Sequence, residues 1–154
     1  MAATYRLRQR RPQHGALRGF TLVELMITLA VMAILAAIAY PQYNRYGFRA
    51  RRADGQKLLM AIANAEERYY AQQNKYADLQ TIGFSTTTTA VSDSGYYKAT
   101  VAVSTVNTFA AQGFTATAAP VKGGAQEKDA CASLTITNTG VKGQSGTTSN
   151  GSCW

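Results

Sequence analysis

Residues 20–40 read FTLVELMITLAVMAILAAIAY, and the only charged side chain in this stretch is that of Glu24. About 20 helical residues, each rising about 1.5 Å, cover the hydrocarbon core of a bilayer. Apolar residues would lie on every side of this helix, which is not the pattern of an amphipathic surface helix. The stretch therefore predicts a transmembrane helix, in which one carboxylate needs a partner or a functional role.

The residues that flank the apolar stretch are also informative. Gly19 precedes it, and Pro41, which lacks an N–H group, follows it and predicts a kink in a helix that continues. An alternative is a secretory signal that is cut before residue 40, because Ala37 and Ala39 have small-x-small spacing. The length of the apolar run and the acidic residue within it argue against that alternative.

The basic residues gather on the two sides of the apolar stretch. The chain has 154 residues and a formal net charge of +8. Residues 1–19 carry five arginines and no acidic residue, and residues 45–57 carry five basic residues against Asp54. The six basic and six acidic residues of 58–154 cancel. This distribution excludes a uniformly basic nucleic-acid-binding domain, and the equal numbers on the two sides leave the membrane orientation open.

Residues 18–25 (RGFTLVEL) resemble the leader junction of the type IV prepilins, the class III signal. In that family a basic leader ends in glycine, and the next residue, Phe, begins an apolar helix with Glu at its fifth position. Gly19, Phe20 and Glu24 match this pattern, and Pro41 matches the family's proline. Residues 66–73 (EERYYAQQ), and 131–137 (CASLTIT) with the terminal Cys153-Trp154, resemble PilE-type minor pilins.

The resemblance implies how the chain is processed and where it is found. A membrane-bound prepilin peptidase would remove the leader, residues 1–19, by cutting between Gly19 and Phe20, and the new amine of Phe20 would be methylated. Glu24 would face the amine of a neighbouring subunit, or its own, during assembly. The subunit would be a single-pass inner-membrane protein with a cytoplasmic N-terminus before processing, and later part of the pilus at the cell surface. Its partners would be other pilin subunits, the peptidase, the inner-membrane assembly platform and membrane lipid.

The rest of the chain predicts an α+β fold. Leu58, Ile62, Ala65 and Tyr69 recur on one face of a helix, so we expect helical structure over residues 20–73, apolar over 20–40 and then amphipathic. Residues 74–93 are predicted to form a loop. Three strand-like segments and two turn-like segments follow, at 95–103, 114–119 and 134–137, and at 122–124 and 138–140. We expect three or four short antiparallel strands in a globular head, residues 74–154, packed on the long helix.

Cys131 and Cys153 are the only cysteines, and both lie in the part expected to be exported. A cysteine pair in an oxidising compartment predicts a disulfide, with two free thiols as the alternative. Closing this glycine-containing loop would stabilise the head by about 3 kcal/mol.

The sequence contains no pattern of catalytic residues. The only histidine, His14, lies in the expected leader. Glu66 and Glu67 are adjacent, so on a helix their side chains point about 100° apart and do not form a facing acid pair. There is no phosphate-binding glycine loop and no metal-ligand spacing. We therefore expect a structural protein without enzymatic activity, metal or cofactor.

Two other functions share parts of this pattern. A type II secretion pseudopilin has the same leader but usually binds calcium through acidic C-terminal loops, and no acidic residue follows Asp129. A DNA-binding competence pilin needs a basic stripe. Residues 58–154 are net neutral, and residues 45–57 fit a solvated or headgroup-contacting face, so a nucleic-acid partner is disfavoured. A patch would require the fold to bring together the remaining candidate lysines, Lys98, Lys122, Lys128 and Lys142.

We therefore expect a type IV pilus subunit, a minor pilin of the PilE kind that primes or joins the fibre. The sequence does not choose among twitching motility, adhesion and DNA uptake, which are properties of the assembled fibre.

Overall fold

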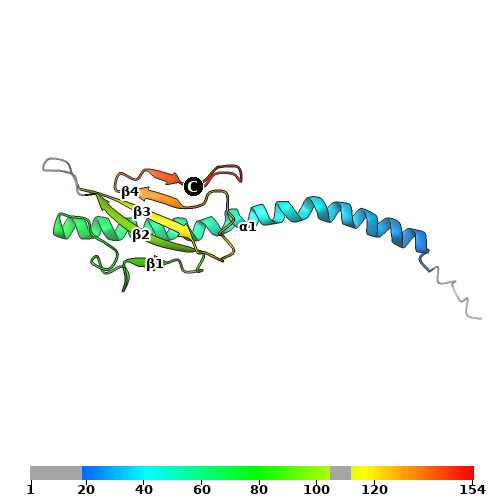
Figure 1. Ribbon diagram of the computed structural model, residues 1–154, viewed down its shortest axis with the longest axis horizontal. Coiled ribbons are helices and arrows are strands. Elements are labelled where there is room, and N and C mark those ends of the chain that lie inside the picture. Colours follow the sequence, from blue (N-terminus) through cyan, green and yellow to red (C-terminus); the bar gives the residue numbers. More distant parts are fainter. Residues whose placement is uncertain (1–18, 105–111) are drawn as a thin grey trace, which may run out of the picture. The chain divides into compact units, whose positions relative to one another are not determined.

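The computed structural model describes residues 19–104 and 112–154 (Figure 1). These residues divide into two compact units at the boundary between Ala39 and Tyr40. The expected leader, with His14, lies outside the described residues except for Gly19. A single helix, α1 (Leu22–Gln73), contributes to both units, and Pro41 lies inside it. The kink at Pro41 stays a prediction.

The N-terminal unit consists of the apolar part of α1. Thr21 precedes the helix, and its Oγ1 accepts a hydrogen bond from the backbone N–H of Glu24 at 3.2 Å. Thr21 therefore caps the helix and satisfies one of the free N–H groups at its start. The side chains of the helix up to residue 39 are exposed. By length and composition, α1 can cross a membrane.

The second unit contains a five-stranded antiparallel sheet in which each strand pairs with the next along the chain. The strands are β1 (Thr89–Val91), β2 (Tyr97–Ser104), β3 (Gly113–Pro120), β4 (Leu134–Thr137) and β5 (Lys142–Gln144). The later part of α1 lies across this sheet (Figure 1). The predicted fold class, a long helix on a small antiparallel sheet, is therefore confirmed.

The number of strands and the long loop were predicted wrongly. Strand β1 lies within residues 74–93, which were expected to form a loop, and β5 (KGQ) was not predicted at all. Both are three residues long and lie at the edges of the sheet. A strand of three residues is too short to show an alternating pattern, and its pairing depends on the hydrogen bonds that a neighbouring strand offers.

The core lies between one face of α1 and the inner face of the sheet. Small residues on the central strands let the helix approach closely, and larger residues of α1 and the sheet fill the remaining space. The buried apolar residues include Leu58, Leu59, Ile62, Tyr97, Ala99, Phe114, Ala116, Ala118, Leu134 and Ile136. A Cβ on Gly55 would lie 2.8 Å from the ring of Tyr97, so this mid-helix glycine makes room for the tyrosine.

The helix face that packs on the sheet also carries a carboxylate. Glu66 is fully buried, its Oε2 accepts a long hydrogen bond of 3.4 Å from the N–H of Ala77, and its Oε1 has no partner among the described residues. Burial raises the pKa of Glu66 to about 7, and the nearby carboxylates of Asp78 and Glu67 add to this shift. Glu66 therefore changes its charge near neutral pH.

We predict that Glu66→Gln flattens the pH dependence of stability. The pKa of Glu66 in the folded state lies above its value of about 4.5 in the unfolded state. The stability that this carboxyl group contributes is therefore fully present when the pH is below about 4.5. As the pH rises to about 7, the wild-type free energy of unfolding should fall by something on the order of 3 kcal/mol relative to the variant. Urea unfolding of both proteins between these pH values measures the difference. Glu127→Gln, at an exposed position in the loop after β3, should keep the wild-type slope, and parallel curves for wild type and Glu66→Gln would contradict the prediction.

Candidate assembly segment and cationic surface

Gly19, Phe20 and Glu24, singled out in the sequence, lie together at the start of the N-terminal unit. With Thr21 they line a shallow hollow, and the side chain of Phe20 is 83% exposed. No cationic group of the described residues lies within ion-pair distance of the Glu24 carboxylate. The start of α1 thus combines an exposed aromatic residue, apolar turns and an unpaired acid.

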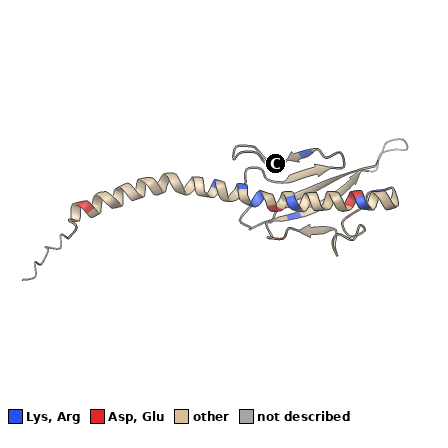
Figure 2. Cartoon of the chain, turned by 180° about the vertical axis from the view of Figure 1, so that it is seen from behind, with Lys and Arg blue, Asp and Glu red and all other residues tan. Residues whose placement is uncertain are grey.

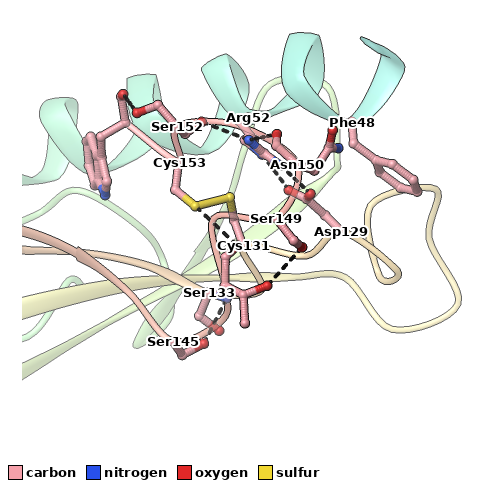
Figure 3. The surroundings of a disulfide bond; sticks show 12 residues. Phe48, Arg52, Asp129, Cys131, Ser133, Ser145, Ser149, Asn150, Ser152 and Cys153 are labelled. Carbon is pink, nitrogen blue, oxygen red and sulfur yellow. Dashed lines mark hydrogen bonds and ion pairs between the residues drawn. A yellow bond between two sulfur atoms is a disulfide. The ribbon is translucent and has the colours of Figure 1, made fainter. Parts of the chain in front are cut away.

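In the second unit, Arg52 joins the helix to two loops. Its side chain is almost fully buried, and its Nε and Nη2 donate to the two carboxylate oxygens of Asp129 at 2.7 and 2.6 Å (Figure 3). Its Nη1 donates to the carbonyl oxygens of Asn150 and Ser152 at 3.0 and 2.8 Å. The hydrogen bonds to Asp129 raise the pKa of Arg52 above its ordinary value, so the guanidinium stays charged despite its burial. We call these four hydrogen bonds the Arg52 clamp.

Gln126 supports the clamp from the same loop as Asp129. Its side-chain amide lies within hydrogen-bond distance of an Asp129 carboxylate oxygen at 2.8 Å, the hydroxyl of Tyr97 at 3.0 Å and the carbonyl oxygen of Phe48 at 3.1 Å. These contacts hold the loop after β3 against both the helix and the sheet. The position of that loop is therefore defined by buried polar contacts.

The disulfide predicted from the sequence is present between Cys131 and Cys153, whose Cα atoms are 5.7 Å apart. It lies beside the Arg52 clamp, and both cysteines are buried (Figure 3). The C-terminal loop is consequently fixed both by a covalent bond to the segment before β4 and by the hydrogen bonds from Arg52.

The sequence reasoning missed Arg52 and Asp129. A signal for Arg52 exists in the helix periodicity, because residues 52, 55, 59, 62 and 66 follow one another at spacings of three and four and form the buried face. Arg52 and Glu66 are the charged residues on that face. Asp129 lies in an irregular loop, where periodicity gives no information.

The clamp brings basic residues from separate parts of the chain to one end of the head. Arg51, next to Arg52, donates to the carbonyl oxygen of Ala125 at 3.2 Å, and its guanidinium lies 6.0 Å from the ring centroid of Phe48 and 5.5 Å from that of Tyr96. The side-chain amide of Asn150 donates to the carbonyl oxygen of Arg45 at 3.2 Å. The helix segment 45–52, the loop 121–129 and the C-terminal loop therefore meet there. Figure 2 shows in blue the basic positions along this part of α1.

We define the cationic surface as the basic residues of these segments that lie outside the clamp, around this end of the head: Arg45, Arg49, Arg51, Lys122 and Lys128. Arg49 lies beside Gly151 of the C-terminal loop, and Arg51 lies on the other side of α1, against the loop 121–129. Glu127 is the exposed acidic residue in the same segments, and its carboxylate accepts a hydrogen bond from the N–H of Gly123. Lys57 is not counted, because it pairs with Asp93 at 2.6 Å. The surface is thus strongly positive although residues 58–154 are net neutral.

The four lysines considered in the sequence analysis are only partly brought together. Lys98 and Lys122 line one surface hollow beside the end of β3. Lys142 lies on β5, three strands away from Lys98 on β2, and its ammonium group is 5.0 Å from the ring centroid of Trp154. The basic segment 45–57, and not Lys142, completes the positive surface.

We predict that removing one partner of the clamp is strongly destabilising. Asp129→Ala leaves the buried charge of Arg52 without a counter-ion and should lower the free energy of unfolding by about 3–5 kcal/mol. Asp93→Ala breaks the exposed pair with Lys57 and should leave stability nearly unchanged. Urea unfolding of the full chain in neutral detergent, with the disulfide intact, compares the two. Similar small losses for both variants would show that the clamp contributes little.

Comparison with known proteins identifies relatives of both units. Residues 41–135 match the family described as "Type IV minor pilin ComP, DNA uptake sequence receptor", and residues 17–40 match the "Prokaryotic N-terminal methylation motif". The type IV major pilin protein PilA of Myxococcus xanthus is 38% identical over 68 residues, which cover 44% of this chain and 31% of PilA. The fimbrial protein EcpC of Eikenella corrodens is 36% identical over 92 residues, which cover 59% of this chain and 57% of EcpC.

A third relative, the type IV major pilin protein PilE1 of Neisseria gonorrhoeae, is 39% identical over 64 residues, or 42% of this chain and 39% of PilE1. The chain thus spans about a third of the length of the first pilins that it matches. A type IV pilin structure from Shewanella oneidensis aligns with 70% of this chain and 97% of its own, at 26% identity and a TM-score of 0.46.

Proposed function

The chain belongs to the type IV pilins, in the ComP family, and we propose that it is a minor subunit that is processed, anchored in the inner membrane and then assembled into a pilus. The observation that carries this proposal is the N-terminal methylation motif over residues 17–40, which includes the exposed apolar part of α1. The family is one of structural pilins, and we propose no catalytic role. The proposed partners are other pilin subunits, the prepilin peptidase, the assembly platform and membrane lipid.

The start of α1 suits assembly through the helix. Cleavage between Gly19 and Phe20 would create an amine on Phe20, and methylation would keep its positive charge. The Glu24 carboxylate, which is costly in an apolar environment when alone, would be paired there with such an amine. Farther along α1, Ala50, Ala53 and Ala61 are exposed, and small residues allow helices to approach closely.

We predict that Glu24→Ala leaves cleavage intact but abolishes incorporation into filaments, because the amine of the next subunit loses its counter-ion. Mass spectrometry of the N-terminus should find methylated Phe20 in both the wild type and the variant, and sheared filaments should contain only the wild type. Glu127→Ala, which removes an acid from the head, should be incorporated normally. Normal incorporation of Glu24→Ala would refute the role of Glu24, and a mature N-terminus at Met1 or Tyr40 would refute the processing.

A second candidate function is DNA binding by the head. Two observations favour it: the match of residues 41–135 to a family described as a DNA uptake sequence receptor, and the cationic surface that the Arg52 clamp brings together. Arginine and lysine side chains that neutralise phosphates release counterions, so a local cluster binds DNA without a basic net charge. The zero net charge of residues 58–154, which argued against a nucleic-acid partner, therefore predicts DNA binding less well than the charge of the local surface does.

We predict salt-sensitive binding of duplex DNA by the full chain in neutral detergent, measured by fluorescence anisotropy. The double variant Arg49→Gln/Lys122→Gln should reduce the slope of log affinity against log salt by about 2, since each lost phosphate contact removes about 0.9. The matched variant Arg68→Gln/Lys75→Gln removes two exposed charges at the other end of the head and should keep the slope. Equal losses for both pairs, or no salt-dependent binding, would dispose of this function.

A further inference from the structure

The cationic surface begins very close to the end of the apolar stretch. Three tyrosines of α1 lie next to its first residue, Arg45. They are Tyr40, Tyr43 and Tyr46, whose side chains are 71%, 76% and 67% exposed. Tyrosine is enriched at the headgroup level of membranes, because its ring is apolar and its hydroxyl is polar. These side chains make no core contacts, so packing of the head does not explain them.

The rise of α1 gives the distances of the first arginines of the surface from Tyr40. At about 1.5 Å per residue, Arg45 lies about 8 Å and Arg51 about 16 Å beyond Tyr40. The headgroup layer on each side of the hydrocarbon core is about 5–8 Å thick, and the Debye length at physiological ionic strength is about 8 Å. With Tyr40 at the edge of the hydrocarbon core, Arg45 reaches the phosphates of the layer, Arg49 lies about one Debye length beyond the layer, and Arg51 lies farther out.

We propose that, in the membrane-anchored subunit, the cationic surface binds the phosphate groups of anionic phospholipids at the same side chains that would contact DNA. The proposal rests on the proposed function in one respect, that the subunit is first anchored and later extracted into a filament. While it is anchored, headgroups occupy the surface; after extraction the surface is free. Lipid and DNA thus exclude one another, and the pool of unassembled subunits does not bind DNA.

Charge and geometry favour lipid as the first occupant. The surface contains five basic side chains and one acidic side chain, that of Glu127. Each basic side chain close to an anionic bilayer strengthens binding about fivefold. Guanidinium groups can donate two hydrogen bonds to one phosphate. The Arg52 clamp keeps the loop that carries Lys122 and Lys128 beside the helix, so the lysines lie at the same end of the head as the arginines. The tyrosines next to it have no role in contacting DNA phosphates but suit the bilayer interface.

The direct test is a titration of the full chain in neutral detergent micelles, followed by backbone amide chemical shifts. The added probes are dihexanoyl phosphatidylglycerol, dihexanoyl phosphatidylcholine and free glycerol phosphate. We expect saturable shifts with phosphatidylglycerol, confined to residues 43–52 and 121–129, and none with phosphatidylcholine. Arg45→Gln/Arg49→Gln should weaken this binding at least tenfold, and Arg68→Gln/Lys75→Gln should not change it; the amide spectra themselves report that the variants are folded.

The second arm measures anisotropy of labelled duplex DNA with the full chain in nanodiscs of phosphatidylcholine or of an equimolar mixture with phosphatidylglycerol. Compared with neutral discs, the anionic discs should weaken DNA binding by the wild type by a factor at least ten times larger than for Arg45→Gln/Arg49→Gln. The variant corrects for the general repulsion of DNA by an anionic disc.

Equal shifts with glycerol phosphate would replace the lipid site by a free-phosphate site and overturn the inference. Shifts that both variant pairs retain would overturn it as well. DNA binding that phosphatidylglycerol does not weaken refutes the competition and leaves the DNA function standing, whereas lipid binding without any DNA binding refutes that function and leaves the lipid site standing.

Discussion

The buried ion pair between Arg52 and Asp129 is the constraint on which the arrangement of the head depends. It connects α1 to the loop after β3, and the remaining hydrogen bonds of Arg52 connect the helix to the C-terminal loop. A buried ion pair gains little net stability, because desolvation offsets its attraction. Its main effect is to select one arrangement of three segments that have few apolar residues of their own. The disulfide fixes the same loop covalently, and the cationic surface forms on the outside of this arrangement.

The packed face of α1 shows two ways in which a protein accommodates a buried ionisable group. Arg52 keeps its charge because a carboxylate and two carbonyl oxygens surround its donors. Glu66, four turns later on the same face, has one long hydrogen bond and one oxygen without a partner, so burial favours its neutral form. The first group stays charged and holds the helix to two loops. The second makes the contact between the end of the helix and the following loop sensitive to protonation.

The sequence was informative where a single period or motif determines the structure. The apolar run after Gly19 and the spacing of Leu58, Ile62 and Ala65 were sufficient to predict the long helix and its packed face, and the cysteine pair predicted the disulfide. Edge strands β1 and β5 could not be predicted, because their pairing partners create them. The cationic surface was also hidden, since Arg51 and the carbonyl of Ala125 that it contacts are 74 residues apart in sequence. Counting charges along the chain cannot show which of them the fold brings together.

The Arg52 clamp also has a mechanical consequence. A pilus subunit is pulled along its N-terminal helix whenever the fibre is under tension, so force reaches the head through α1. The four hydrogen bonds of Arg52 then share the load between the helix and two loops, and the Cys131–Cys153 bond passes it to the segment before β4. Bonds loaded together in this way must break together, whereas strands peeled from a sheet edge give way one bond at a time. The clamp thus makes the junction of helix and head resistant to traction.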